Sequence, residues 1–202
     1  MGKYREQWSA LHGNARPSRL VSSWLATAEV LAKPLIWLRL SPNVISLIGL
    51  VMAGVAYIAT PSRIAAVIVL LSLVLDGLDG AVAVLTNRVT TWGGIIDSFV
   101  DRMGEALWAG ALVVAGVDAR IALTAWCLAL IQEYARARGL TLAPHAEVKA
   151  TLCERPVRAL LIASALAVGS LAGGASAWAL LWLVFQAIGF VQVWRATGDL
   201  LR

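Results

Sequence analysis

Four aspartates lie inside segments that are otherwise apolar enough to cross a membrane. Asp76 and Asp79 interrupt the apolar run 64–85, and Asp97 and Asp101 follow in the next apolar run. An ionisable side chain at membrane depth is costly, so it normally faces a cavity, a partner or a metal ion. Four such carboxylates cannot all stay ionised and unpaired in a low-dielectric helix bundle. Their grouping predicts a cationic partner, and a divalent metal ion is the simplest candidate.

The spacing of the aspartates predicts that they meet at one level of a helical hairpin. Asp76 and Asp79 are three positions apart, and Asp97 and Asp101 are four apart, so each pair shares one helix face. The first pair lies late in its predicted helix and the second lies early in the next, so a tight antiparallel connection brings all four to a similar depth. Carboxylate oxygens at this density suit Mg²⁺ or Mn²⁺, which bind carboxylates together with substrate phosphates.

The composition indicates an all-α integral membrane protein. Of the 202 residues, 59% are hydrophobic and only 14% are charged, and the mean hydropathy is +0.76, which excludes an ordinary soluble domain. No nucleic-acid partner is expected. The two cysteines, Cys127 and Cys153, form neither a metal-type spacing nor a disulfide framework.

The apolar runs predict six transmembrane helices, because a bilayer core takes roughly 20 apolar residues of helix. We expect residues 1–41 to form a cytoplasmic N-terminal segment and residues 42–202 to form one six-helix domain. The predicted spans are 43–60, 63–86, 94–116, 120–138, 156–173 and 176–196.

The segment Leu20–Leu40 predicts an amphipathic helix that lies in the cytoplasmic membrane interface. It carries Trp24 and further apolar residues among Arg and Lys, and Pro34 predicts a kink. A soluble amphipathic hairpin is the alternative reading.

The basic residues predict the orientation in the membrane. With six spans, only Arg63 and Arg120 fall on the far side, and Arg102 falls within a span. The positive-inside rule then places both termini in the cytoplasm and the aspartates near the cytoplasmic face. We expect the membrane to be a bacterial plasma membrane. The basic residues on the cytoplasmic side are Lys3, Arg5, Arg16, Arg19, Lys33, Arg39, Arg88, Arg136, Arg138, Lys149, Arg155, Arg158, Arg195 and Arg202.

The aspartates belong to a longer string that resembles a known motif. Asp76-Gly-Leu-Asp79-Gly80-Ala-Val-Ala83 is followed by Gly93, and then by Asp97 and Asp101 at the same spacing of four. This string resembles the motif D-x2-D-G-x2-A-R-x8-G-x3-D-x3-D of the CDP-alcohol phosphotransferase family, also called the CDP-alcohol phosphatidyltransferases. Seven of the eight fixed positions match, with every spacing kept. The predicted six helices and interfacial helix also resemble this family, so the likeness covers nearly the whole chain.

The resemblance implies an enzyme of phospholipid biosynthesis. Its donor would be a CDP-linked lipid such as CDP-diacylglycerol, its acceptor a small polar alcohol, and its by-product CMP. Asp76, Asp79 and Asp97 would hold two divalent ions, Mg²⁺ or Mn²⁺, with Asp101 completing the metal site. The resemblance also makes Asp101 the candidate general base for the acceptor hydroxyl. Membrane lipids are implied as surroundings, and family members are often homodimers.

One fixed position departs from the family motif, because Val84 stands where the family has Arg. This departure concerns the nucleotide contacts and leaves the metal ligands intact. Arg88, one helical turn later, is a candidate to reach back to the nucleotide; its alternative role is a cytoplasmic anchor. The segment Ser41-Pro42-Asn43 resembles the family's Thr-Pro-Asn, either as a nucleotide contact or only as a helix cap. The implied nucleotide-binding residues are Asn43, Gly80, Ala83, Arg88 and Gly93.

Three arginines are candidates to bind the acceptor. Arg136, Arg155 and Arg195, with their neighbours, resemble the bacterial phosphatidylinositol-phosphate synthase branch of the family, where such residues bind the phosphate of inositol phosphate. Arginine suits that role because its planar fork meets phosphate oxygens in pairs. The alternative is that these arginines only follow the positive-inside rule. Tyr134 stands where that branch has Lys, so a phosphatidylglycerophosphate or cardiolipin-type synthase remains open.

Two readings outside this enzyme class are also open. Intramembrane carboxylates also mark ion paths, so a divalent-cation transporter is one rival. The other is an inactive homologue that only binds lipid, for which Val84 is the support.

Overall fold

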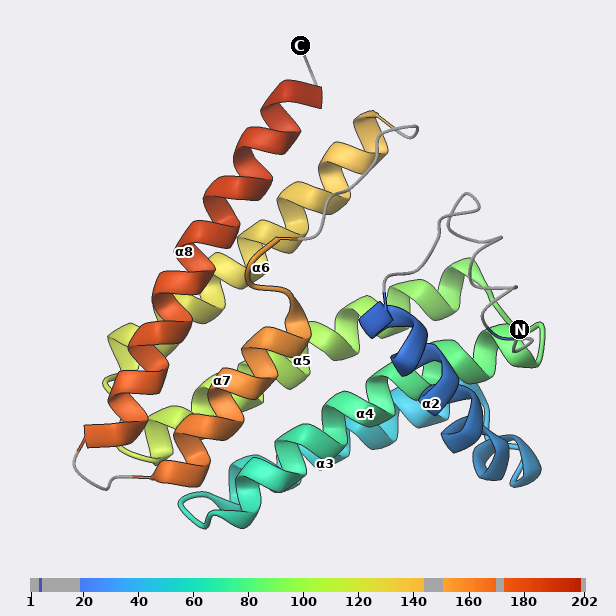
Figure 1. Ribbon diagram of the computed structural model, residues 1–202, viewed down its shortest axis with the longest axis horizontal. Coiled ribbons are helices and arrows are strands. Elements are labelled where there is room, and N and C mark those ends of the chain that lie inside the picture. Colours follow the sequence, from blue (N-terminus) through green and yellow to red (C-terminus); the bar gives the residue numbers. More distant parts are fainter. Residues whose placement is uncertain (1–3, 5–18, 144–150, 170–172, 201–202) are drawn as a thin grey trace. The chain divides into compact units, whose positions relative to one another are not determined.

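The computed structural model describes residues 4, 19–143, 151–169 and 173–200, and within these residues all regular secondary structure is helical (Figure 1). The all-α prediction is confirmed for this part of the chain. The helices are α2 (Arg19–Trp37), α3 (Pro42–Ala59), α4 (Ile64–Leu85), α5 (Thr91–Val114), α6 (Ala119–Leu142), α7 (Arg155–Val168) and α8 (Gly174–Leu200).

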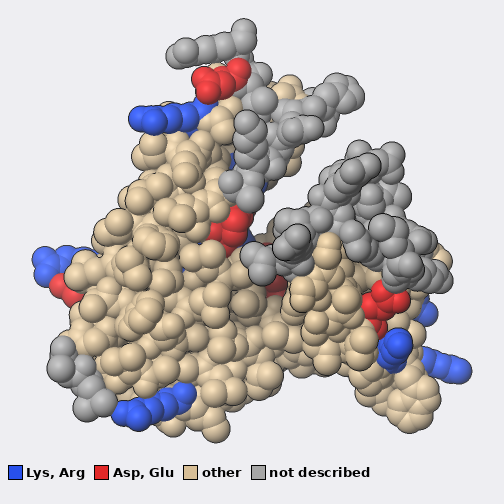
Figure 2. Space-filling view, viewed as in Figure 1, with Lys and Arg blue, Asp and Glu red and all other residues tan. Residues whose placement is uncertain are grey.

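Three of these helices, α3, α4 and α8, are long and apolar enough to cross a membrane, where the sequence predicted six spans. Their most apolar stretches have mean hydropathies of 1.8, 2.2 and 1.7. Helix α5 differs because it carries Asp97, Asp101, Arg102 and Glu105, and α7 differs because it has only 14 residues. On the face that Figure 2 shows, acidic and basic side chains lie only in small groups.

Local sequence determines where the helices begin. The Ser41 hydroxyl accepts a hydrogen bond from the Val44 N–H at 3.3 Å, so Ser41 caps α3 as its sequence predicted. Thr90 plays the same role for α5, because its Oγ1 accepts from the Gly93 N–H at 3.0 Å. The Asp118 carboxylate accepts from the Arg120 N–H at 2.8 Å and caps α6. These caps satisfy backbone donors that have no partner within the helix.

The chain forms two compact units. The first unit consists of residues 1–51 and 71–103 and contains α2, the start of α3, the end of α4 and the start of α5. In its core the buried face of α2 packs with residues of α3 and α4, and Trp24 of α2 lies over Gly77 of α4, where a Cβ would come within 2.5 Å of the indole. The helical residues of this core are Leu25, Ala28, Ala32, Ile45, Leu78, Ala81 and Val82.

The second unit consists of residues 52–70 and 104–202. Within it α8 packs against α6 and α7. Gly189 of α8 allows a close approach, because a Cβ there would lie 3.1 Å from Gln132 Oε1 and 3.4 Å from the Cys153 backbone nitrogen. Gln132 also accepts a hydrogen bond from Gln186 at 2.8 Å, and both amide side chains are buried. Such a bond compensates two polar groups that would be costly in an apolar interior.

Helix α8 provides a direct test of this packing. We expect Gly189→Leu to lower the free energy of unfolding by about 1–3 kcal/mol, because overpacking strains a filled interior. Gly198→Leu on the same helix is the matched control, since a Cβ at Gly198 meets nothing within 4 Å. Thermal unfolding in detergent measures both variants, and equal losses would contradict the packing described for Gly189.

Candidate active site

Three of the four aspartates come together in the first unit. Asp76 on α4 and Asp97 and Asp101 on α5 each offer a carboxylate oxygen, and these oxygens lie within 4.8 Å of one another. All three residues are partly buried. Three hard oxygen donors at this separation fit Mg²⁺ or Mn²⁺, which bind a few protein carboxylates and leave positions for phosphate oxygens. The predicted convergence of these three residues from two helices is therefore present.

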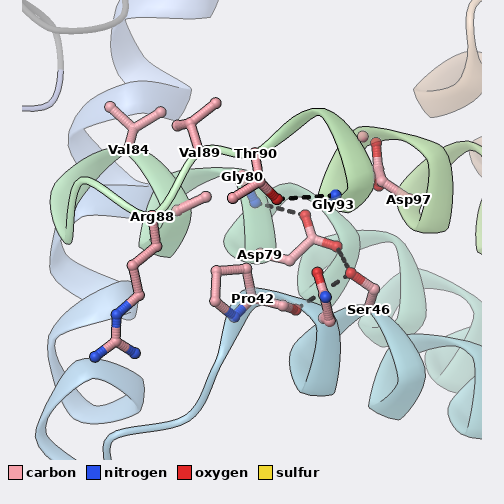
Figure 3. Close-up of a pocket in the computed structure, with 13 residues that line it drawn as sticks. Pro42, Ser46, Asp79, Gly80, Val84, Arg88, Val89, Thr90, Gly93 and Asp97 are labelled. Atoms are coloured by element: carbon pink, nitrogen blue, oxygen red, sulfur yellow. Dashed lines mark hydrogen bonds between the residues drawn. The ribbon is translucent and has the colours of Figure 1, made fainter.

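Asp79 lies one turn after Asp76 but is held differently. Its side chain is 5% exposed and accepts hydrogen bonds from the Ser46 hydroxyl and from the Gly80 N–H (Figure 3). Charge at this depth requires such donors. Asp79 is not part of the group of three, although it lines the same pocket as Asp97.

Ser46 is a site residue for which the sequence analysis assigned no role. Its hydroxyl also donates to the Pro42 carbonyl at 3.2 Å, as serines inside helices often do. The available signal was a lone hydroxyl in an apolar run, one turn after the proline that begins α3.

A pocket lies between the ends of three helix segments of the first unit (Figure 3). The first turns of α3 and α5 and the last turns of α4 form it, together with the connection that carries Arg88, Val89 and Thr90. All five residues expected at the nucleotide line this pocket, and Asp79 and Asp97 line it too. Those five are Asn43, Gly80, Ala83, Arg88 and Gly93.

The glycines around the site do not share one role. A Cβ at Gly80 would meet nothing within 4 Å, so packing does not require glycine there and the space opens toward the pocket. A Cβ at Gly93 would lie 3.0 Å from Thr90 Oγ1 and 3.5 Å from Asn43 Oδ1. The tighter of these two contacts is with Thr90, so Gly93 leaves room for the Thr90 hydroxyl that caps α5.

The end of α4 brings Arg88 to the pocket. Asn87 has a φ of +55°, a left-handed conformation that asparagine tolerates well. The Arg88 N–H donates to the Ala83 carbonyl at 2.8 Å and the Asn87 N–H donates to Val84 at 3.1 Å. This pair of bonds is a Schellman motif, which reverses the chain after the helix. Val84, at the position of the family arginine, lines the pocket and also packs against the core of the first unit.

The three arginines expected at the acceptor belong to the second unit. Arg136 on α6 forms a bidentate pair with Glu154, at 2.9 and 2.7 Å. Arg155 lies over the Trp108 ring, with 5.4 Å from the guanidinium carbon to the ring centroid, and its Nε is 3.7 Å from Glu105. Arg195 is exposed on α8.

The short segment 151–155 connects the elements that carry these arginines. Glu154 binds Arg136 of α6, and the Leu152 N–H donates to Gln192 Oε1 of α8 at 2.9 Å. Arg155 itself begins α7. The segment thus touches α6 and α8 and continues into α7.

Glu154 is stabilised as a carboxylate. Burial alone would raise its pKa, but hydrogen bonds from Arg136 and from the Thr151 N–H and hydroxyl outweigh burial and lower the pKa of Glu154 to about 2. The same bonds fix the segment before α7.

Comparison with known proteins identifies the class. The family model of the CDP-alcohol phosphatidyltransferases matches residues 39–194, and the chain belongs to this family. An archaetidylinositol phosphate synthase of Aeropyrum pernix is 32% identical over 173 residues, which cover 80% of this chain and 85% of that protein. An archaetidylinositol phosphate synthase of Pyrococcus horikoshii is 33% identical over 81 residues, 39% of this chain and 43% of that protein.

Solved structures share the fold. The phosphatidylinositol phosphate synthase of Mycobacterium tuberculosis with CDP-DAG bound superposes with a TM-score of 0.71 at 22% identity, over 84% of this chain and 92% of that one. The same enzyme in complex with manganese and citrate gives a TM-score of 0.71 at 21% identity, over 85% and 88% of the two chains. The chain described here is thus an enzyme of the CDP-alcohol phosphatidyltransferase class, which fits the carboxylate cluster and its expected divalent metal.

The Glu154 contacts predict a pH-dependent stability. The folded pKa is about 2 and the ordinary value is 4.5, so the stabilisation is fully present above about pH 4.5 and is lost as the pH falls toward 2. We expect Glu154→Gln to lower the free energy of unfolding by up to about 3 kcal/mol at pH 7. Unfolding of both proteins at pH 7, 5 and 3 measures the difference, which should shrink at pH 3. A difference that is constant with pH would contradict this account.

Proposed function

We propose that the protein transfers a phosphatidyl group from CDP-diacylglycerol to the hydroxyl of inositol phosphate and releases CMP. The observation that carries this proposal is the group of carboxylates from Asp76, Asp97 and Asp101, with Asp97 also lining the pocket. The donor is supported by the CDP-DAG bound to the mycobacterial relative, and the acceptor by the names of the archaeal and mycobacterial relatives.

In the proposed site, the four aspartates Asp76, Asp79, Asp97 and Asp101 hold two divalent ions, Mg²⁺ or Mn²⁺. Hard oxygen ligands support this choice, and manganese is present in one structure of the mycobacterial relative. Bound ions would neutralise negative charge on the diphosphate and on the departing CMP. Ser46 orients Asp79 through its hydroxyl.

Asp101 is the proposed general base. It accepts the proton of the acceptor hydroxyl while the hydroxyl oxygen attacks the phosphorus on the lipid side. The bond from that phosphorus to CMP then breaks, and CMP leaves with the electron pair. The Arg102 guanidinium lies 3.6 Å from the Asp101 carboxylate and is its cationic neighbour.

The proposed nucleotide site is the pocket formed by Asn43, Gly80, Ala83, Arg88 and Gly93. Gly80 leaves space for the ligand, and Asn43 offers a side-chain amide at the start of α3. Arg88 would supply the charge that Val84 cannot, because it reaches the same pocket from the turn after α4.

The proposed acceptor site consists of Arg136, Arg155 and Arg195. Two observations support it: the segment 151–155 contacts both α6 and α8, and Trp108 supports the Arg155 guanidinium. Arginine forks bind phosphate oxygens in pairs, so these residues favour a phosphorylated alcohol over a neutral polyol.

The proposed topology has six spans, α3 to α8, in a bacterial-type plasma membrane. Residues 42–202 form the catalytic domain, and residues 1–41 form a cytoplasmic segment in which α2 lies in the interface. The exposed apolar side chains of α2, such as Val30 at 60% and Trp37 at 82%, support that position. Both termini and the active site then face the cytoplasm, as the basic residues favour. The proposed assembly is a homodimer, as the family resemblance implies.

The decisive assay is CMP release from CDP-diacylglycerol with Mg²⁺ or Mn²⁺. Acceptors to compare are inositol phosphate, glycerol phosphate, free inositol and phosphatidylglycerol. We expect release that requires metal and inositol phosphate. Release with glycerol phosphate or phosphatidylglycerol instead would assign a phosphatidylglycerophosphate or cardiolipin-type synthase, and no release with any acceptor would contradict the proposed transferase.

Asp101→Asn tests the general base in the same assay. We expect turnover to fall about 10²–10⁴-fold, the usual contribution of a positioned base. Binding of the CDP-lipid, measured by thermal stabilisation in detergent, should weaken far less than turnover falls, because the pocket residues and the other three aspartates are unchanged. Full turnover by Asp101→Asn would remove Asp101 from the mechanism.

Arg88→Ala tests the nucleotide pocket. A charge-assisted contact to phosphate is worth about 1.5–3 kcal/mol, so we expect the KM for the CDP-lipid to rise about tenfold or more. Arg63→Ala is the matched control, because Arg63 is an exposed arginine outside the pocket. If both variants keep the wild-type KM, Arg88 is only a membrane anchor.

A further inference from the structure

Arg158 of α7 is a buried guanidinium within the second unit, and it joins three elements. Its side chain is 0% exposed. It binds Glu105 of α5 at 2.8 Å and Glu133 of α6 at 2.6 Å, and its Nε donates to the Cys153 carbonyl at 3.1 Å. A buried charge persists only when it is paired and hydrogen-bonded in this way.

The same two glutamates also face the arginines of the proposed acceptor site. Glu105 Oε1 lies 3.7 Å from Arg155 Nε, and Glu133 Oε2 lies 3.4 Å from Arg136. In each case the contact with Arg158 is shorter, at 2.8 and 2.6 Å. Arg158 is therefore the nearer cationic partner of both carboxylates.

The balance of charge gives this arrangement a consequence. Within the part of the chain that the structure describes, the cluster contains three carboxylates, of Glu105, Glu133 and Glu154, and three guanidinium groups, of Arg136, Arg155 and Arg158. Without Arg158 the carboxylates would exceed the guanidinium groups by one. Glu105 would then interact more strongly with Arg155, and Glu133 with Arg136, because an unpaired charge in a low-dielectric interior is destabilised.

We propose that Arg158 is a positioning residue for the acceptor: by binding Glu105 and Glu133, it keeps these carboxylates from competing with the acceptor phosphate for Arg155 and for Arg136. Glu154 is then the carboxylate partner that the phosphate must displace from Arg136. This inference rests on the proposed acceptor site. Arg158 itself is buried and does not touch the substrate. Its effect is specific to anionic acceptors, whereas a purely structural ion pair would affect both substrates and stability alike.

The test compares KM for the two substrates in full-length protein variants in detergent. For Arg158→Gln we expect the KM for inositol phosphate to rise about tenfold, equivalent to ~1.4 kcal/mol, with the KM for CDP-diacylglycerol changed less than about twofold. The charge-balanced variant Glu105→Gln with Arg158→Gln should recover most of the acceptor KM. Arg120→Gln is the matched control, because Arg120 also pairs with a carboxylate in this unit but is exposed.

Three results would overturn the inference. The first is a parallel rise of both KM values in Arg158→Gln, and the second is a double variant no better than the single one. If Arg158→Gln does not fold, Glu105→Gln alone is informative, because it removes a competitor and should leave the acceptor KM no higher than in wild type. A raised acceptor KM in Glu105→Gln is the third overturning result.

A binding measurement separates this inference from the proposed function. Calorimetric titration of inositol phosphate onto the metal-free protein reports acceptor binding without turnover. Weaker binding to Arg158→Gln than to wild type supports the inference even if the wild type releases no CMP. CMP release by wild type together with unchanged inositol phosphate binding in Arg158→Gln would keep the transferase and reject the role of Arg158. No binding to wild type would reject the proposed acceptor site and the role of Arg158 with it.

Discussion

Compensation of charge inside an apolar helical protein is the constraint on which this structure depends. Three acidic residues that are largely withdrawn from water have partners that offset their desolvation. Asp79 has the Ser46 hydroxyl and the Gly80 N–H, Glu105 has Arg158, and Glu154 has Arg136 together with Thr151. The carboxylates of Asp76, Asp97 and Asp101 also lie close to one another, and the Arg102 guanidinium is 3.6 Å from Asp101. Three like charges at that separation favour a bound cation.

The same constraint explains why helix ends are concentrated at the pocket. Apolar helices expose polar backbone groups only where they begin or end. The pocket uses three such places: the start of α3, the end of α4 and the start of α5, where Ser41, Asn87 and Thr90 form the caps and turns. A polar ligand such as a nucleotide can approach backbone groups here without breaking a helix.

Much of this organisation could be predicted from the sequence, because the signals are local. Apolar runs predicted each helix to within a few residues. The spacing of the aspartates predicted the meeting of Asp76, Asp97 and Asp101, but it did not predict that Asp79 is held apart from them. Gly80, Ala83 and Gly93 followed from the family motif, Asn43 from the Ser-Pro-Asn resemblance, and Arg88 from its place one turn after Val84. Contacts between distant segments could not be predicted in this way. Nothing local links Glu105 to Arg158, 53 positions later, or Ser46 to Asp79, because tertiary packing alone brings them together. The number of membrane spans was hard to predict for another reason. Helix α5 carries the charged side chains of the proposed site, and these lower its hydropathy below that of the three apolar helices α3, α4 and α8.

The two proposed recognition sites fall in different compact units of the chain. Every residue that lines the proposed nucleotide pocket lies in the first unit, and each arginine of the proposed acceptor site lies in the second. Substitutions that adapt a descendant to a new alcohol can therefore accumulate in one compact body without repacking the other. Such a division gives a lineage of lipid synthases a way to diversify its headgroups while it inherits one activated donor unchanged.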